Sequence, residues 1–215
     1  MASLGRLAEL LDGRLVGDPT IEVHDVVMDS RSVAPGSLFC CVKGERDDGH
    51  DHADEAVRVG AVALLCEREL STPAPALIVD DVRPAMAVAA AHVHGSPSAS
   101  LDVVGVTGTN GKTTVVSMIE AIMVGAGRKP ASIGTLTGAR TTPEAPDLQR
   151  QLASMLADGV DTVAMEVSSH ALSMHRVDAV DFAVAVFTNL GTDHLDFHST
   201  PEAYFAAKAR LFEPG

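Results

Sequence analysis

The chain has 215 residues, which suits one large or two small domains, and 46% of them are hydrophobic, enough to bury a core. Aromatic residues make up 3% and Trp is absent, so Ala, Val and Leu must build that core. A net charge of −13 argues against a protein that binds nucleic acid or a membrane surface through bulk positive charge.

The cysteines and the N-terminus bear on the compartment. Cys40, Cys41 and Cys66 form neither a CxxC pair nor an even framework, so we interpret them as buried thiols of a cytoplasmic protein. The first residues lack a basic segment followed by an apolar one, so we expect no signal peptide. No apolar run approaches the roughly 20 residues that a membrane helix needs.

The first part of the chain predicts short, alternating elements. Residues 3–11 carry apolar side chains at helical spacing behind a serine, which predicts a capped helix. Residues 23–44 predict two strands around a turn at 34–36, and 52–67 predict a helix that runs into a buried strand. A strand over 75–81 and a helix over 84–95 follow.

Residues 95–100, GSPSAS, are small and polar and predict a domain linker. Beyond them, apolar strands alternate with amphipathic helices, which is typical of a mostly parallel sheet covered on both faces. We therefore expect an α/β fold, with a small domain over residues 1–97 and a parallel-sheet domain over 98–215. The last helix has no following strand, so we expect this second domain to be incomplete.

The stretch TGTNGKTT, residues 107–114, predicts a phosphate-binding loop. The common pattern G-x-x-x-x-G-K-[ST] would require glycine at position 106, which is Val106. The loop nevertheless joins a buried strand to a helix, whose first N–H groups and positive dipole end bind anions. Gly108 and Gly111 let the backbone approach phosphate oxygens, and Lys112 supplies charge. An ordinary glycine-rich turn is the competing interpretation.

TGTNGKTT is also the form that this loop takes in Mur ligases and folylpolyglutamate synthetases. The segments DSRSVAPGSLFCCVKG, TTPEAPDLQ, MEVSSHAL, NLGTDHLDFH and YFAAKARLF appear in the order found in Mur ligases. The chain therefore resembles the Mur ligase family over essentially its whole length. The resemblance implies a uridine-nucleotide domain followed by the first part of the central ATPase domain. We expect the rest of that domain and the family's C-terminal, amino-acid-binding domain to be missing from these 215 residues.

The resemblance implies an activity with several partners. Family members most like this chain join UDP-MurNAc-L-Ala-D-Glu to a diamino acid, meso-diaminopimelate or L-lysine, in peptidoglycan synthesis. ATP first phosphorylates the D-Glu carboxylate, and the amino group then displaces phosphate from the acyl phosphate. We expect a cytoplasmic monomer that requires Mg²⁺ and contacts neither nucleic acid nor membrane. The choice of amino acid belongs to the C-terminal domain.

The resemblance also assigns residues to the reaction. The nucleotide-binding residues would be Gly108, Thr109, Asn110, Gly111, Lys112, Thr113 and Thr114. Catalysis would depend on Lys112, Glu166, His194 and Lys208. Mg²⁺ would be held by Thr113, Glu166, His194 and a carbamylated Lys208, formed with CO₂.

Each assignment has a plainer alternative. Glu166 could be a solvated carboxylate at a strand end, and Lys208 a solvent-facing helix lysine. Carbamylation requires a neutral amine, which then becomes an anion that can bind Mg²⁺. His170 and His198 compete with His194 but are expected to be structural. A zinc site at His194 and His198 is disfavoured because no third ligand has a recognisable spacing.

A third group of residues would bind the sugar nucleotide. By resemblance these are Met28, Ser30, Glu45, Arg46, Asp47, Thr141, Thr142, Ser168, Met174 and Arg176. Arg176 suits an acidic group because its guanidinium can bind a carboxylate through two hydrogen bonds. The family commonly has Gln at the position of Met174, and Met cannot donate the same hydrogen bonds. Residues 45–55 are rich in acidic side chains, but they lack a metal-binding spacing and predict a loop that caps a helix.

Two alternatives remain to the ligase interpretation. The chain could hold UDP-MurNAc-dipeptide without ligating it, or it could be another Mur-type or folate-type ligase. The segments DSRSVAPGSLF and TTPEAPDLQ argue against the latter, because in the family they serve the uridine and muramoyl ends. We expect the chain by itself to form no amide bond and to bind ATP weakly or not at all.

Overall fold

The structure is a computed structural model that describes residues 1–44 and 47–213. The chain divides into two compact units, Met1–Gly95 and Ser96–Gly215. Each unit has its own sheet and its own buried apolar clusters.

The first unit is built on a five-stranded sheet in the order β2-β7-β6-β5-β4. Its strands are β2 (Arg14–Val16), β4 (Asp25–Val27), β5 (Ser37–Cys40), β6 (Ala61–Cys66) and β7 (Ala76–Ile78). The last four are parallel, and β2 joins the edge antiparallel to β7. A two-stranded sheet pairs β1 (Ala2–Ser3) with β3 (Glu22–Val23). The loops after β4 and β5 therefore leave the same edge of the sheet.

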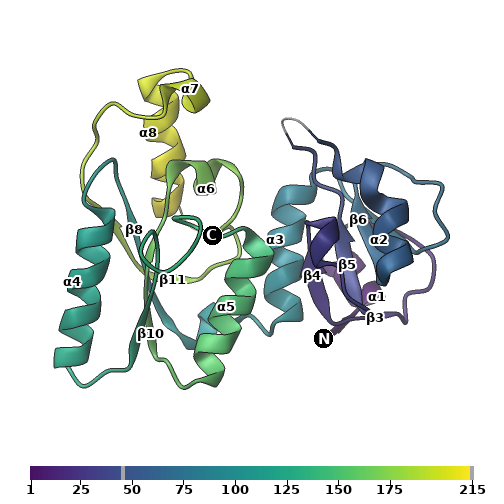
Figure 1. Cartoon of the computed structure of the whole chain (residues 1–215), viewed down its shortest axis with the longest axis horizontal. Coiled ribbons are helices and arrows are strands. Elements are labelled where there is room, and N and C mark those ends of the chain that lie inside the picture. Colours follow the sequence, from purple (N-terminus) through teal and green to yellow (C-terminus); the bar gives the residue numbers. More distant parts are fainter. Residues whose placement is uncertain (45–46, 214–215) are drawn as a thin grey trace. The chain divides into compact units, whose positions relative to one another are not determined.

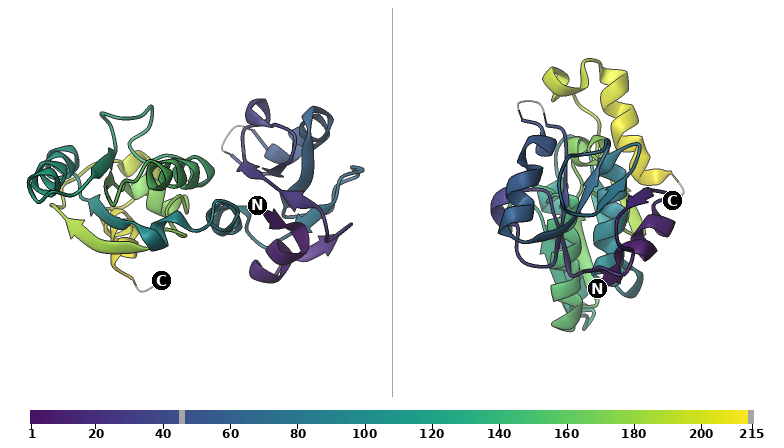
Figure 2. Two further views of the ribbon diagram at one scale, coloured as in Figure 1. Left: turned by 90° about the horizontal axis from the view of Figure 1, so that it is seen from below. Right: turned by 90° about the vertical axis from the view of Figure 1, so that its right-hand side faces the viewer.

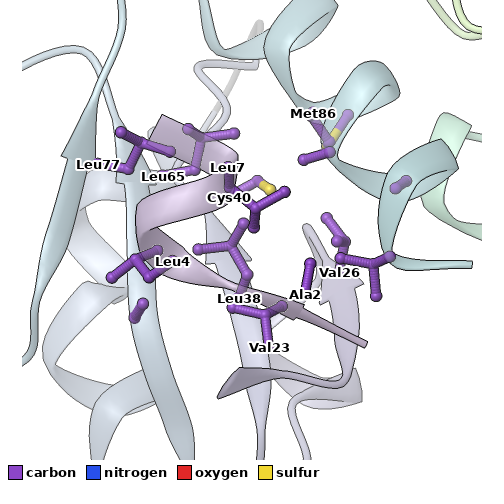
Figure 3. Packing of buried hydrophobic residues seen from close by; sticks show 14 of the residues in the cluster. Ala2, Leu4, Leu7, Val23, Val26, Leu38, Cys40, Leu65, Leu77 and Met86 are labelled. Carbon is purple, nitrogen blue, oxygen red and sulfur yellow. The ribbon is translucent and has the colours of Figure 1, made fainter. Parts of the chain in front are cut away.

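Helices cover both faces of this sheet. Leu4 and Leu7 of α1 (Leu4–Leu10) and Met86 of α3 (Val82–Val93) pack against one face, as Figure 3 shows. α2 (Ala53–Val59) packs against the other face through its alanines. The predicted serine cap is confirmed, because Ser3 accepts a hydrogen bond from the N–H of Arg6 at 3.3 Å. Two short 3-10 helices, η1 (Ser30–Ser32) and η2 (Gly49–His52), lie in the loops.

The second unit contains four parallel strands in the order β11-β8-β10-β9. These are β8 (Asp102–Thr107), β9 (Pro130–Ile133), β10 (Thr162–Glu166) and β11 (Phe182–Phe187). Glu166 pairs with Val106, and Phe187 pairs with Thr107. The carboxyl ends of these three strands are therefore level, and the loops that follow them emerge together.

Side-chain alternation directs the helices of this unit to opposite faces. Val116 of α4 (Lys112–Gly125) packs with Val104 and Val106, whereas Leu148 of α5 (Ala145–Ala157) packs with Val103. Figure 1 shows α4 and α5 on opposite sides of the strands, and the view from below in Figure 2 agrees. The remaining helices are α6 (Ser169–Ser173), α7 (Leu195–His198), α8 (Pro201–Ala209) and η4 (Arg210–Phe212).

The predicted linker is folded rather than free. Residues 97–100 form a 3-10 helix, η3 (Pro97–Ser100), in which Pro97 and Ser98 are buried. The hydroxyl oxygen of Ser98 accepts a hydrogen bond from the N–H of Asp181 at 3.1 Å. The composition of this segment predicted a linker, because the residue that contacts it, Asp181, lies far along the chain and leaves no local signal.

The secondary structure and the cysteines agree with the sequence. The helices and strands predicted from periodicity are present, although their ends differ by a few residues. The three cysteines are free and buried, and burial raises the pKa of Cys41 to about 12. Within 1–44 and 47–213, no helix combines the length and apolar character that crossing a membrane requires.

Candidate functional site

The site of interest lies at the carboxyl edge of the four-stranded sheet. Segments 108–111, 134–144, 167–168 and 188–194 follow β8, β9, β10 and β11 at this edge. Helices α6, α7 and α8 lie at the same end of the unit, which is at the top in Figure 1. Ligands of open parallel sheets bind at such an edge, so these segments form the candidate site.

The phosphate loop has a backbone that only glycine accommodates readily. Gly108 has φ 142° and Gly111 has φ 84°, both in the left-handed range. A Cβ atom on Gly108 would lie 1.9 Å from Oγ1 of Thr188. Helix α4 begins at Lys112, directly after this loop, so its unpaired first N–H groups open toward the sheet edge.

Two lysines converge on one backbone oxygen of the loop. Nζ of Lys112 donates to the carbonyl oxygen of Gly108 at 2.8 Å and to that of Thr109 at 3.0 Å. Nζ of Lys208, on α8, donates to the same Gly108 oxygen at 2.9 Å. Lys208 is only 1% exposed, and its Nζ lies 4.4 Å from the ring centroid of Tyr204. Residues about 100 positions apart in the sequence thus place two ammonium groups together.

Burial lowers the pKa of both lysines. Burial and, to a lesser extent, the nearby charge of Lys112 lower the pKa of Lys208 to about 8, against the opposing charge of Asp193. The pKa of Lys112 is also lowered by burial, against the charges of Glu166 and Asp193. The predicted alternative for Lys208, a solvent-facing lysine, is therefore wrong. Asp193 lies near both ammonium groups, although sequence reasoning did not single it out.

Glu166 ends β10 inside the site and is 2% exposed, so it is not a solvated strand-end carboxylate. Its Oε1 accepts a hydrogen bond from the N–H of Thr135 at 2.9 Å. A Cβ atom on Gly134 would lie 2.4 Å from the same oxygen. The absence of a side chain at position 134 therefore lets the loop after β9 close over this carboxylate.

His194 belongs to a group of rings that meet edge to face or at a tilt. Its ring centroid lies 4.6 Å from that of His170, which in turn lies 4.2 Å from Phe197 and 5.5 Å from His198. His194 is about half exposed, with Nε2 3.5 Å from Oδ2 of Asp193. Burial, then the charge of His194, lowers the pKa of both His170 and His198. Nε2 of His198 also lies 2.9 Å from the hydroxyl of Ser169, which suits the structural role expected for it.

Thr142 links two of the segments at the sheet edge. Its hydroxyl donates to the carbonyl oxygen of Glu166 at 2.9 Å and accepts from the N–H of Ser168 at 3.1 Å. Ser168 caps α6 by accepting from the N–H of Ala171 at 3.1 Å. Thr141 is more exposed, and its hydroxyl lies 3.1 Å from that of Thr135. Both hydrogen bonds of the buried Thr142 hydroxyl are thus made within the protein, whereas Thr141 remains partly exposed.

Arg176 is almost buried and already has an acidic partner. Its Nη2 lies 2.7 Å from Oε1 of Glu144, and its Nη1 donates to the carbonyl oxygen of Thr142 at 3.2 Å. Nη1 of Arg140 lies 3.2 Å from the same Glu144 oxygen. Nη2 of Arg176 also lies 3.3 Å from the sulfur of Met174. Met174, which stands where the family commonly has Gln, therefore contacts the Arg176 guanidinium through its sulfur.

In the first unit, the predicted uridine residues lie at the carboxyl edge of the parallel strands. Met28 and Ser30 follow β4, and Asp47 follows β5. Oδ1 of Asp29 caps the turn, and the carboxylate binds the guanidinium of Arg31 at 2.7 Å. Asp47 is exposed, with Oδ2 2.9 Å from Nε2 of His52. Glu45 and Arg46, the other two predicted residues here, lie outside the described residues.

The donor set suits a magnesium ion only in part. In the described part of the chain, no group of three or more His, Cys, Asp and Glu side chains is arranged to hold a metal ion. Mg²⁺ in nucleotide sites usually takes one or two protein ligands and completes its shell with water and phosphate oxygens. The buried carboxylate of Glu166 and the hydroxyl of Thr113 at the start of α4 fit such a partial set.

Sequence reasoning missed several residues that build the site. Thr188, Asn189, Asp193, Tyr204 and Glu144 all contact predicted site residues or the phosphate loop. The segment NLGTDHLDFH contains Asn189 and Asp193, and Thr188 directly precedes it. The sequence signal that could have identified these residues is their position at the end of a predicted parallel strand, because such strand ends meet at the same sheet edge as the phosphate loop. Glu144 lies in the quoted segment TTPEAPDLQ, but only the structure shows its pairing with Arg176.

Comparison with protein families extends these observations to both units. Residues 106–214 match the model of the Mur ligase middle domain, and residues 22–100 match that of the Mur ligase family catalytic domain. A UDP-N-acetylmuramoyl-L-alanyl-D-glutamate–2,6-diaminopimelate ligase of Geobacillus kaustophilus is 51% identical over 205 residues, which are 91% of this chain and 42% of the relative. The ligase of the same name from Halalkalibacterium halodurans is 46% identical, over 96% of this chain and 45% of the relative.

Solved structures give the same result. A UDP-N-acetylmuramoyl-L-alanyl-D-glutamate–2,6-diaminopimelate ligase superposes with a TM-score of 0.83 at 29% identity, over 98% of this chain and 45% of that one. MurF ligase from Thermotoga maritima, solved in complex with ADP, has a TM-score of 0.61 at 25% identity, over 88% of this chain and 43% of that one. The chain spans less than half the length of these relatives. Its family is nevertheless established by sequence over both units, and the chain belongs to the Mur ligase family.

Proposed function

We propose that this chain supplies the sugar-nucleotide and ATP-phosphate sites of a ligase that joins a diamino acid to UDP-MurNAc-L-Ala-D-Glu. The observation that carries the proposal is the convergence of Lys112 and Lys208 on the Gly108 oxygen, beside the buried carboxylate of Glu166. Phosphoryl transfer to a carboxylate brings several anions together, and such a site needs cations and helix N–H groups in fixed positions. The names of the relatives favour the diaminopimelate ligases within the family.

Each residue of the second unit would have a distinct role. The N–H groups at the start of α4 and the ammonium of Lys112 would bind the terminal phosphates of ATP. The D-Glu carboxylate of the substrate would attack the γ-phosphorus, giving an acyl phosphate and ADP. An amine would then displace phosphate to form the amide. Mg²⁺, held by Thr113 and Glu166 and further by His194 and carbamylated Lys208, would neutralise the phosphate charges.

Each unit contains residues predicted to serve the sugar nucleotide. Met28, Ser30 and the segment 45–47 would bind the uridine end. Thr141, Thr142, Ser168, Met174 and Arg176 would bind the muramoyl-dipeptide. Arg176 can serve its acidic end only if the substrate carboxylate shares the guanidinium with Glu144, since that pair is already formed at 2.7 Å.

Calorimetry with UDP-MurNAc-L-Ala-D-Glu and with UDP tests this assignment. The chain should bind both ligands, and UDP-MurNAc-L-Ala-D-Glu should bind more tightly than UDP. Arg176→Ala should remove this difference but leave the affinity for UDP, and a dispersed amide spectrum of the second unit should report that the variant is folded. Arg150→Ala is the matched control, because it removes one guanidinium from an exposed position of the same unit. A wild-type chain that binds neither ligand would refute the proposed function.

The chain spans less than half the length of its relatives. By itself it would bind the sugar nucleotide without ligating it. We expect no tripeptide when the chain is mixed with UDP-MurNAc-L-Ala-D-Glu, ATP and diaminopimelate, and little affinity for ATP. Mass spectrometry that detects the tripeptide product would contradict this expectation.

A further inference from the structure

The segment 188–191, which follows β11, lies directly against the phosphate loop. The N–H of Thr188 donates to the carbonyl oxygen of Thr107 at 3.0 Å, and the N–H of Thr109 donates to that of Asn189 at 2.9 Å. The pairing between β8 and β11 therefore continues past the ends of both strands. The first half of the phosphate loop is held as an extension of the sheet.

The side chain of Asn189 binds both backbone groups of one loop residue. Its Oδ1 accepts from the N–H of Asn110 at 3.1 Å, and its Nδ2 donates to the carbonyl oxygen of Asn110 at 3.1 Å. The hydroxyl of Thr188 donates to the same oxygen at 2.7 Å. Asn110 therefore has a fixed peptide orientation that depends on residues about 80 positions away.

A second contact fixes the neighbouring residue of the loop. The hydroxyl of Thr109 accepts from the N–H of Gly191 at 2.8 Å and lies 3.1 Å from the hydroxyl of Tyr204. The space between loop and segment is filled, because any Cβ atom at Gly108 would overlap Thr188. The loop and the segment 188–191 thus form one packed structure.

These contacts divide the loop into two parts. The N–H groups of Thr109 and Asn110 are used by Asn189, so they are turned away from a bound phosphate. The N–H groups of residues 111–114 open helix α4 and have no partner within that helix. A phosphate would therefore be bound by the second part of the loop, while the first part sets its position.

We propose that Asn189 is a positioning residue for the phosphate site. Its carboxamide fixes the Asn110 peptide, and this orients the N–H groups of residues 111–114 without touching the phosphate. The inference rests on the proposed function, because it needs a phosphate to be bound at the start of α4. It adds a residue to which the resemblance gave no role, and it assigns Thr109 and Asn110 a supporting rather than a binding role.

Nuclear magnetic resonance of the 215-residue chain tests the proposal with two measurements. The first is hydrogen exchange of the Thr109 and Asn110 amides. The second is a titration with inorganic tripolyphosphate and Mg²⁺, followed through the amide shifts of residues 111–114. Asn189→Ala should speed exchange at Asn110 about tenfold and weaken tripolyphosphate binding about tenfold, the loss expected for hydrogen bonds of ordinary strength.

Two further variants control for the loss of fold. Thr188→Val removes the other side-chain bond to the Asn110 oxygen at nearly constant volume and should change both measurements in the same direction. Leu190→Ala changes an exposed side chain of the same segment and should change neither. All three variants should keep the dispersed amide signals of β8, β10 and β11, which report that the second unit remains folded.

The outcomes separate this inference from the proposed function. If the wild-type chain binds tripolyphosphate and Asn189→Ala binds it equally well, the positioning role is wrong and the phosphate site stands. Unchanged exchange at Asn110 in Asn189→Ala would likewise refute the role, whatever the affinity. If millimolar tripolyphosphate does not shift the amide signals of residues 111–114 in the wild-type chain, the phosphate site is wrong and the inference falls with it.

Discussion

Lys208 shows at the scale of one residue how the fold changes chemistry. A lysine with 1% exposure cannot keep its charge as easily as one in water, because burial removes the solvent that stabilises an ammonium. The charge of Lys112 adds to this, so the pKa of Lys208 falls from 10.5 to about 8. A substantial fraction of the amine is then neutral near physiological pH, and only the neutral amine reacts with CO₂.

We therefore predict that Lys208 forms a carbamate at mildly alkaline pH. In ¹³C-bicarbonate, the chain should show a carbamate resonance that grows as the pH rises toward about 8, since the neutral fraction grows with it. Lys208→Arg should lack this resonance. A resonance of equal intensity in Lys208→Arg would show that another amine carries the carbamate.

The same shift in pKa predicts a pH dependence of stability. Between about 8 and 10.5 the unfolded chain binds more protons at this position than the folded chain does. The free energy of unfolding should therefore rise as the pH is raised through this interval. Urea denaturation in CO₂-free buffer should show the rise for the wild type and a smaller one for Lys208→Met. Parallel curves for the two proteins would contradict the lowered pKa.

How far the sequence predicts single residues depends on what fixes them. Glu166 ends an apolar strand, so its place at the sheet edge followed from periodicity. Asp193 and Asn189 act through partners about 80 residues away, and no local pattern carries that information. The burial of Lys208 could not be predicted from the sequence either, because it depends on packing of its helix against α6 and the phosphate loop.

At the scale of elements, the phosphate loop and helix α4 decide the geometry of the site. The loop departs from the common glycine spacing, yet its strand and helix contexts are those of an anion site. The left-handed residues Gly108 and Gly111 turn the chain within the loop. Of the two, Gly108 is the more restricted, because Thr188 occupies the space where a side chain would begin.

Gly108→Ala should destabilise the second unit by about 1–3 kcal/mol or more, from the left-handed φ and the overlap with Thr188 together. Gly125→Ala is the matched control, because it lies in α4 with no heavy atom within 4 Å of the new Cβ. That variant should gain up to about 1 kcal/mol from helix propensity. Thermal denaturation measures both. Equal stability of the two variants would contradict the close packing of the loop.

Periodicity predicted the longer elements, because each must bury one face in the core. It missed α6, α7 and β2, which span five, four and three residues and carry too little pattern to stand out. It also treated residues 95–100 as a linker, whereas Ser98 is buried against Asp181. Short elements and buried turns depend on distant partners, and these become visible only in the fold.

At the scale of the whole molecule, the chain consists of two units with separate cores. The apolar clusters around Leu38 and Phe39 draw only on the first unit, and the cluster around Leu148 only on the second. Both units match Mur ligase models, whereas the relatives are more than twice as long as the matched region. Under the proposed function, each unit would supply one of the binding surfaces that the reaction requires.

We predict that residues 1–95 fold when produced without the rest of the chain. Their sheet has helices on both faces, and its clusters need no side chain from beyond Gly95. The fragment should unfold cooperatively in urea and give a dispersed amide spectrum. A collapsed spectrum with no unfolding transition would show that the first unit depends on the second.

The most direct measurement for the whole account is a crystal structure of the chain with Mg²⁺ and a non-hydrolysable ATP analogue, supplied at a concentration high enough to fill a weak site. The account predicts terminal phosphates on the N–H groups of residues 111–114, with Lys112 bound to them and Glu166 and Lys208 facing the metal. Phosphates bound elsewhere in the unit, or a loop left empty at saturating analogue, would contradict it.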